Sequence, residues 1–192
     1  MAEEEATIIG TSESSIHRNG DVLSGYPGGG FPAAKLIDGK SLDGKWAPER
    51  GCAHTEGGSM PQWFSVELET SQQVTKVSIV GRAGQTGKPG EGDQGKDVTV
   101  TIGQSKGYDA NEPLCLPVIP HLEDTWTDYV CTGGPKYGKY VKFSANRNWF
   151  TMCEVKIYTN TTAAPPVPTT TSAPGEKSVI VIARHLMVTW RK

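Results

Sequence analysis

The chain has 192 residues, 36% of them hydrophobic, and a formal net charge of −2 from 19 basic and 21 acidic side chains. This near balance excludes a protein that holds nucleic acid mainly through positive charge, and no apolar run is long enough to insert into a membrane. The 23 glycines and 13 prolines, together with scarce helical periodicity, predict one compact all-β domain with appendages.

Alternation of apolar and polar residues predicts short strands along the chain. It is clearest in FSVELE at 64–69, where Phe64, Val66 and Leu68 fall on one face that should be buried. Gly-rich connections are typical of antiparallel strands, and two half-polar sheets bury their apolar faces against each other. We therefore expect an antiparallel β-sandwich or jelly roll. Its strands are predicted, in chain order, at residues 6–9, 64–69, 74–80, 98–102, 140–143 and 155–158.

The organisation of the chain follows from the segments between and after these strands. Residues 81–95 are rich in glycine and too poor in apolar groups for a core, so they predict a long surface loop. The globular unit then spans 6–158, and a Thr/Pro-rich linker that does not pack follows at 159–175. Three interpretations of the short tail at 176–192 stay open: the start of a truncated neighbouring segment, an oligomerisation strand, and sequence added for expression.

Four cysteines, at positions 52, 115, 131 and 153, allow three pairings and lack the short paired spacings of a zinc site, which favours two disulfides. The glycosylation sequon at Asn160 and the Ser/Thr/Pro tract after it favour a secreted or extracellular protein. Met1 is followed by an acidic run instead of a signal peptide, so we expect the sequence of a mature or expressed form.

Five short motifs occur along the globular unit: AKLIDG at 34–39, GCAHT at 51–55, PQWFSVEL at 61–68, VGR at 80–82 and MCEV at 152–155. Together they resemble the F-type lectin, or fucolectin, family, whose fold is a β jelly roll of the discoidin kind. The resemblance covers roughly residues 6–158. It implies the disulfide pairing Cys52–Cys153 and Cys115–Cys131, whose long bridge would tie an early loop to the last strand.

The resemblance also implies a site for L-fucose in which imidazole and guanidinium groups hydrogen-bond to sugar oxygens. His54 and Arg82 match the first two positions of the family's sugar motif, with Gly84 at its spacer. The second basic residue departs from the family spacing: the nearest candidate is Lys88, and Lys96 lies further along the loop. The plainer alternatives are a histidine that caps a turn and a solvated arginine.

Two further features bear on the sugar. The methyl group of fucose requires an apolar wall, and we assign this wall to Trp46. A tryptophan buried in the core is an equal alternative for this residue. The loop also lacks the two adjacent cysteines that many family members carry, and ordering residues 85–95 on binding would cost affinity. We therefore expect a weaker or shifted monosaccharide preference.

The family carries a structural Ca²⁺ ion, which here implies side-chain ligands at Asp38 and Glu154. Calcium takes six to eight oxygens, so backbone carbonyls would complete the shell. Such an ion would hold the sugar-site loop to the final strand, although glycine replaces a frequent serine at position 51 and a plain turn at 38–39 is the alternative. The carbonyls implied are those near Lys35, Lys40, Gly51 and Cys153.

Catalytic motifs are absent from the sequence: the four histidines are scattered, and no H-E-x-x-H or nucleophile elbow occurs. We therefore predict a non-enzymatic, calcium-stabilised lectin that recognises fucosylated glycans in self/non-self or cell recognition. Several copies, in a homo-oligomer or as repeats of a longer chain, would raise its avidity. The alternative is a non-sugar adhesion module of discoidin type that binds a protein or phospholipid surface.

Overall fold

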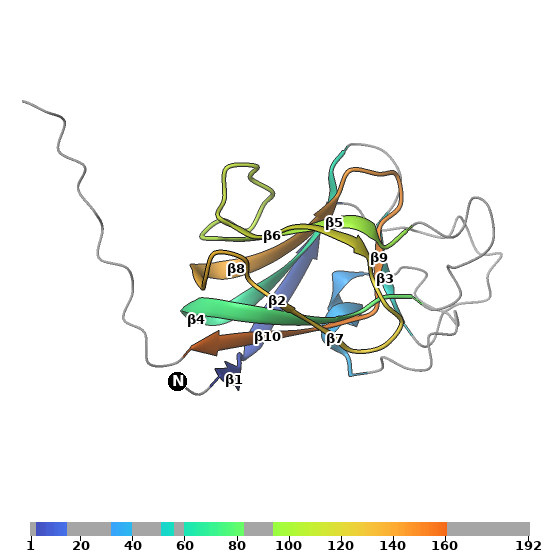
Figure 1. Ribbon diagram of the computed structural model, residues 1–192. Helices are drawn as coiled ribbons and strands as arrows, with labels where there is room; N and C mark the ends of the chain where they lie inside the picture. Colours follow the sequence, from blue (N-terminus) through green and yellow to red (C-terminus); the bar gives the residue numbers. More distant parts are fainter. Residues whose placement is uncertain (1–2, 15–31, 40–50, 56–59, 83–93, 161–192) are drawn as a thin grey trace, which may run out of the picture.

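The computed structural model describes residues 3–14, 32–39, 51–55, 60–82 and 94–160, and in these ranges antiparallel strands form a curled sandwich (Figure 1). Within the same ranges no helix is long and apolar enough to cross a bilayer. The elements are, in chain order, β1 (Glu3–Glu5), β2 (Ile8–Glu13), the 3-10 helix η1 (Ala33–Ile37), β3 (Ala53–His54), β4 (Gln62–Val80), β5 (Lys96–Gly103), β6 (Leu114–His121), β7 (Thr127–Val130), β8 (Lys136–Ala145), β9 (Thr151–Met152) and β10 (Glu154–Asn160).

Strand β4 belongs to both layers of the sandwich. Its first half pairs with β2, its second half pairs with β10 and β7, and β8 pairs with part of both halves. The sequence predicts two strands here, at 64–69 and 74–80, but the structure joins them. No glycine or proline interrupts the segment between them, so the chain passes from one layer to the other through a register shift between Glu67 and Gln72.

Cross-strand registers stack the apolar residues of the core in rows. Phe64 of β4 lies opposite Phe143 of β8, which lies opposite Val100 of β5. All three are fully buried, as the alternation in the sequence predicts. The next row consists of Val66, Val141 and Ile102. The predicted all-β jelly roll is confirmed.

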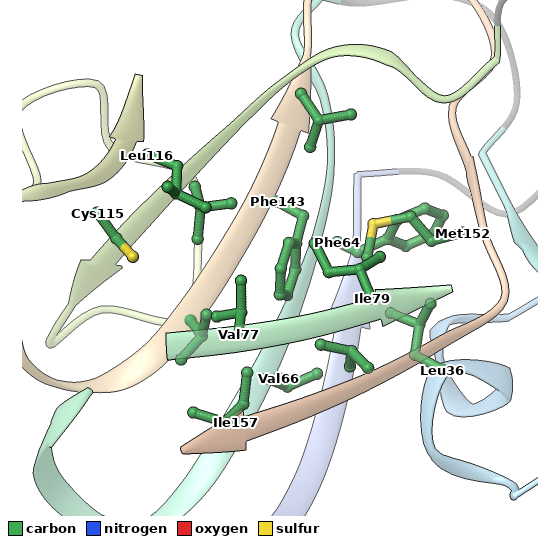
Figure 2. Packing of buried hydrophobic residues seen from close by; sticks show 14 of the residues in the cluster. Leu36, Phe64, Val66, Val77, Ile79, Cys115, Leu116, Phe143, Met152 and Ile157 are labelled. Carbon is green, nitrogen blue, oxygen red and sulfur yellow. The ribbon is translucent and has the colours of Figure 1, made fainter. Parts of the chain in front are cut away.

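The core is completed by short elements at one end. Figure 2 shows Leu36 of η1 and Met152 of β9 close to Ile79 of β4, and all three belong to one buried cluster. Neither η1 nor β9 has an apolar face large enough to stand alone, so both depend on this packing.

The termini of the sheet differ from the predicted bounds. In place of one strand at 6–9 there are two, β1 and β2, and between them Ala6 N donates to Ile157 O at 2.8 Å. Strand β10 continues to Asn160, because Thr159 is buried and its Oγ1 donates to Gln72 Oε1 at 2.8 Å. The first two residues of the predicted linker therefore belong to the sheet, and residues 161–192 lie outside the described part.

The bend in β4 brings both of its ends to the same end of the sandwich. Gln62 pairs with Ala145, shortly before β9, and Val80 pairs with Glu154, shortly after β9. We call this the site end. The connection between β5 and β6 lies at the other end, which we call the far end (Figure 1).

Candidate functional site

His54 lies in strand β3, not in a loop, and its partner across the short β3–β9 pair is Thr151. The side chain is 8% exposed, and ring Nδ1 lies 2.7 Å from the carbonyl oxygen of Thr55. A carbonyl oxygen only accepts, so Nδ1 carries the hydrogen and Nε2 of the neutral ring is an acceptor. In this geometry a neutral His54 can accept a bond from a hydroxyl at Nε2 but cannot donate one there.

The two-residue strand that carries His54 is fixed on both sides. Thr55 N donates to Phe150 O, and Phe150 N donates to Thr55 Oγ1, both at 2.9 Å. On the other side the Cys52–Cys153 disulfide joins β3 to the residue before β10. This bridge and the second one, Cys115–Cys131, have the pairing that the resemblance implies.

Arg82 follows β4. The glycine before it, Gly81, allows the chain to pass close to the segment at Leu122 and Glu123. Gly81 N donates to Glu123 O at 2.6 Å, and a Cβ atom on Gly81 would lie 2.7 Å from Leu122 Cβ. A larger residue would push the chain away from this neighbouring segment. The arginine placed by this contact is half-buried, and its Nη1 donates to Gln94 Oε1 at 3.0 Å.

Gln94 is a site residue that the sequence analysis misses. Its Oε1 also accepts a bond from Thr151 Oγ1 at 3.0 Å, and its backbone oxygen accepts from Thr151 N at 3.0 Å. Because Thr151 is the cross-strand partner of His54, the amide of Gln94 connects the arginine to the strand pair of the histidine. We call Arg82, Gln94, Thr151 and His54 the polar chain.

The remaining sugar-site predictions divide between described and undescribed residues. Trp46, Gly84 and Lys88 lie outside the described residues. Lys96 is the first residue of β5, half-buried and opposite His121. The structure therefore relates His54 to Arg82 only through Thr151 and Gln94, and it places Lys96 two residues after Gln94 at the site end.

The segments that the resemblance assigns to calcium meet beside η1. Asp38 follows η1, and its Oδ2 lies 3.9 Å from Lys35 Nζ. Gly51 has φ +54°, and a Cβ atom there would lie 2.7 Å from Lys35 Nζ and 3.3 Å from Asp38 Oδ2, so the position favours a glycine. Glu154 begins β10, is 3% exposed and lines the same cleft as Gly39.

Oxygen donors from these segments fit the hard-ligand preference of calcium. Among the described residues no three His, Cys, Asp or Glu side chains gather in a way that could hold a metal, so carbonyls would have to supply most of the shell. Cys153 immediately precedes Glu154 and is buried, whereas Lys40 lies outside the described part. The Lys35 ammonium beside Asp38 opposes a divalent cation and would have to swing away when one binds.

The helix that leads to Asp38 is anchored from β2. Glu13 Oε2 accepts a bond from Ala33 N, the first residue of η1, at 3.1 Å. Burial raises the pKa of Glu13, and this backbone bond opposes the rise. The contact ties the start of η1 to the edge of the first sheet.

Comparison with known proteins finds no matching protein-family model and no matching curated protein. Solved structures share the fold. An F-lectin (fucolectin) from the serum of striped bass, Morone saxatilis, matches at 22% identity with a TM-score of 0.57, over 78% of this chain and 45% of that one. A pectin-binding carbohydrate-binding module matches at 16% identity with a TM-score of 0.56, over 84% and 96%. A fucose-binding module of Streptococcus pneumoniae, SpX-3, matches at 20% identity with a TM-score of 0.55, over 79% and 93%.

This chain thus spans less than half of the length of the striped bass lectin. At these identities the likeness concerns the fold: the chain has the jelly roll of F-type lectins and discoidin-like carbohydrate-binding modules. The resemblance read from the sequence motifs is confirmed at that level.

Proposed function

We propose that this domain binds carbohydrate and that its ligand is L-fucose on fucosylated glycans. The observation that carries the proposal is the polar chain, in which Arg82 Nη1 and Thr151 Oγ1 both donate to Gln94 Oε1 beside His54. Neighbouring sugar hydroxyls each donate and accept, so they match a surface that offers both functions. The guanidinium supplies forked donors, and Nε2 of a neutral His54 supplies an acceptor.

The structural neighbours support carbohydrate as the ligand class. Two of those reported above are named for fucose binding and one for pectin binding, so this fold serves chemically different sugars. The choice of fucose rests on the match of His54 and Arg82 to the family's sugar motif. The proposed role is recognition without reaction, and the two disulfides support an extracellular location.

Calorimetric titration of L-fucose into the wild type and into Arg82→Ala tests this function. Loss of the charge-assisted bonds should weaken binding about tenfold or more. The melting temperature should change little, since the side chain is half-exposed. Lys139→Ala is the control, because it removes a cation that pairs with Glu67 at 2.9 Å, away from the polar chain. Unchanged affinity in Arg82→Ala, or a wild type that binds no fucosylated glycan on an array, would contradict the proposal.

Calcium is proposed as a structural ligand of the same domain, held by Asp38 and Glu154 together with backbone carbonyls. Binding would fix the segment after η1 to the start of β10 and so rigidify the site end. Thermal unfolding should shift to lower temperature when EDTA is added to the wild type. Asp38→Asn should lower the melting temperature without EDTA and respond little to it. An EDTA-insensitive wild type would remove calcium from the proposal and leave sugar binding untouched.

A second function, docking on a phospholipid surface, is favoured by exposed apolar side chains at the site end. Met60, just before β4, is 50% exposed, and Trp149, after β8, is 49% exposed. Trp149 also has φ +46°, a conformation that a bulky residue adopts at an energetic cost. Their loops adjoin, because Gln62 pairs with Ala145.

Flotation with phosphatidylserine vesicles separates this function from sugar binding. The sugar proposal predicts that the protein stays at the bottom of the gradient. Co-flotation that is lost in Met60→Ser/Trp149→Ser, together with an empty glycan array, would establish the second function instead.

A further inference from the structure

A cleft of about 490 Å³ lies beside η1 and β10, and no member of the polar chain lines it. Its volume falls within the range of about 300–1,000 Å³ that small-molecule sites occupy. The lining mixes apolar and charged side chains, which is unlike the uniformly apolar surface of a buried void. The lining residues that matter here are Glu5, Ile8, Ile37, Trp126, Glu154 and Lys156.

Trp126 gives the cleft an aromatic wall. It immediately precedes Thr127, which pairs with Ile79 of β4, and Ile79 pairs in turn with Val155 of β10. Trp126 therefore stands across β4 from the start of β10, and Lys156 Nζ lies over its ring, 5.4 Å from the centroid. A sugar that stacks on this face of the ring has to displace the ammonium to its rim. An indole that lines a cleft and is still 44% exposed can take the flat apolar face of a ligand.

An ion pair supplies the polar side of the cleft. Lys156 Nζ donates to Glu5 Oε2 at 3.0 Å, and the two side chains are 40% and 52% exposed. The bond to Glu5 raises the pKa of Lys156 and so favours the charged form of the lysine. Exposed pairs of this kind contribute little to stability, so a ligand can re-bond both partners at small cost. The carboxylate accepts from a hydroxyl, and the ammonium donates to one.

We propose that this cleft is a second carbohydrate subsite, which takes one neutral pyranose with its C–H face on Trp126 and its hydroxyls on Glu5 and Lys156. A pyranose has one apolar face and a polar rim, and the cleft offers one aromatic wall and one ion pair. Ile8 and the 38%-exposed Ile37 add apolar surface for an exocyclic carbon. In the calcium-free protein, in which the titrations are made, acidic sugars are disfavoured, because the lining carboxylates of Glu5 and Glu154 outnumber the ammonium of Lys156. The inference rests on the proposed function, that this domain binds carbohydrate.

Indole and backbone resonances in NMR titrations test the subsite directly. The probes are methyl β-D-galactopyranoside, methyl β-D-glucopyranoside and, as the acidic counterpart, methyl β-D-glucuronide. The Trp126 indole signal, assigned with Trp126→Phe, should shift saturably with at least one neutral glycoside in both the wild type and Arg82→Ala. Trp126→Ala and Lys156→Ala should each weaken this binding about tenfold. Val130→Ala, which shortens a 66%-exposed side chain elsewhere on β7, is the matched control.

Three results would overturn the subsite. The first is the absence of a saturable shift at Trp126 or Lys156 with either neutral glycoside, and the second is glucuronide binding as tight as that of the neutral sugars. The third is a Trp126 shift that disappears in Arg82→Ala, because the signal would then come from the polar chain. Titration of L-fucose into Trp126→Ala separates the two proposals. If fucose binding is retained and one of the three results above is found, the subsite alone is rejected. If no variant binds any sugar, both proposals are rejected.

Discussion

The two ends of the sandwich both hold a cation beside an oxygen acceptor, but they use it differently. At the far end Lys142 is completely buried, and its Nζ donates to Glu112 and to Ser105 Oγ, the latter at 3.3 Å. Glu112 folds back over Gly103, where a side chain would collide with the carboxylate. At the site end Arg82 is half-buried and donates to the neutral amide of Gln94.

This contrast separates a cation enclosed with a carboxylate from a cation that a neutral amide orients. A lysine bonded to a carboxylate in the interior has its charge neutralised there, so it serves to hold the β5–β6 connection in place. The amide of Gln94 orients the guanidinium through a neutral acceptor, which is the arrangement that the proposed sugar site uses. The same contrast ranks the effects expected from mutations at the two ends.

Loss of the site-end disulfide should give the largest effect, and loss of the far-end disulfide a smaller one. Cys52–Cys153 closes a loop with a sequence separation of 101, against 16 for Cys115–Cys131. In the chain-entropy account these bridges contribute about 4.7 and about 3 kcal/mol. Urea unfolding of Cys52→Ser/Cys153→Ser and Cys115→Ser/Cys131→Ser should preserve that order. A larger loss from the far-end variant would contradict it.

Breaking the far-end ion pair should come next. Lys142→Met leaves Glu112 buried without its cation, which should lower the free energy of unfolding by about 3–5 kcal/mol. Lys142→Met/Glu112→Leu should recover most of the loss, because the buried carboxylate is gone as well. Lys139→Met, at the partly exposed pair with Glu67, is the control and should shift the denaturation midpoint far less. Sugar binding by Lys142→Met, measured below its unfolding transition, should equal that of the wild type.

Gln94 should show the opposite behaviour, with a small effect on stability and a larger one on binding. Gln94→Ala removes the acceptor shared by Arg82 and Thr151, and L-fucose affinity should fall about tenfold. Gln94→Glu keeps an oxygen at that place, but its negative charge would pair with the guanidinium, so the affinity should stay below that of the wild type. Gln104→Ala, which removes the far-end acceptor of Ser71 Oγ at 2.9 Å, is the matched control. Equal melting and equal fucose affinity in Gln94→Ala would remove this residue from the site.

The sequence predicts those parts of the fold that depend on a local pattern of residues. Phe64, Val66 and Leu68 alternate with more polar positions and are fully buried, because the period of a strand is fixed by its own backbone. Strands β6 and β7 lack such a local pattern, so the sequence does not predict them. Strand β6 contains Pro117 and Pro120, which are tolerated because it lies at the edge of its sheet, and Val130 of β7 is exposed.

The site could be predicted only in part, because two of the four residues of the polar chain are brought there by tertiary contacts. His54 and Arg82 are named by the motifs in which they stand. Gln94 and Thr151 have no such motif, and they enter the site only because β9 pairs with β3 and meets the turn before β5. The direction of hydrogen bonding at His54 is likewise set by a backbone carbonyl that the sequence does not place.

The smallest effect should come from the exposed ion pair between Lys76 and Asp128, at 2.9 Å, on the outer face of β4 and β7. The bond from Lys76 lowers the pKa of Asp128, so the pair stabilises the fold above the usual aspartate pKa of about 3.9 and loses that contribution as the pH falls through the lowered pKa. Solvent screening limits the contribution to about 0–1 kcal/mol. Asp128→Asn should therefore unfold at slightly lower urea than the wild type at neutral pH and at the same urea in strong acid. Asp124→Asn, a nearby exposed aspartate, is the control. A difference between Asp128→Asn and the wild type that persists in strong acid would show that the substitution acts through packing instead of charge.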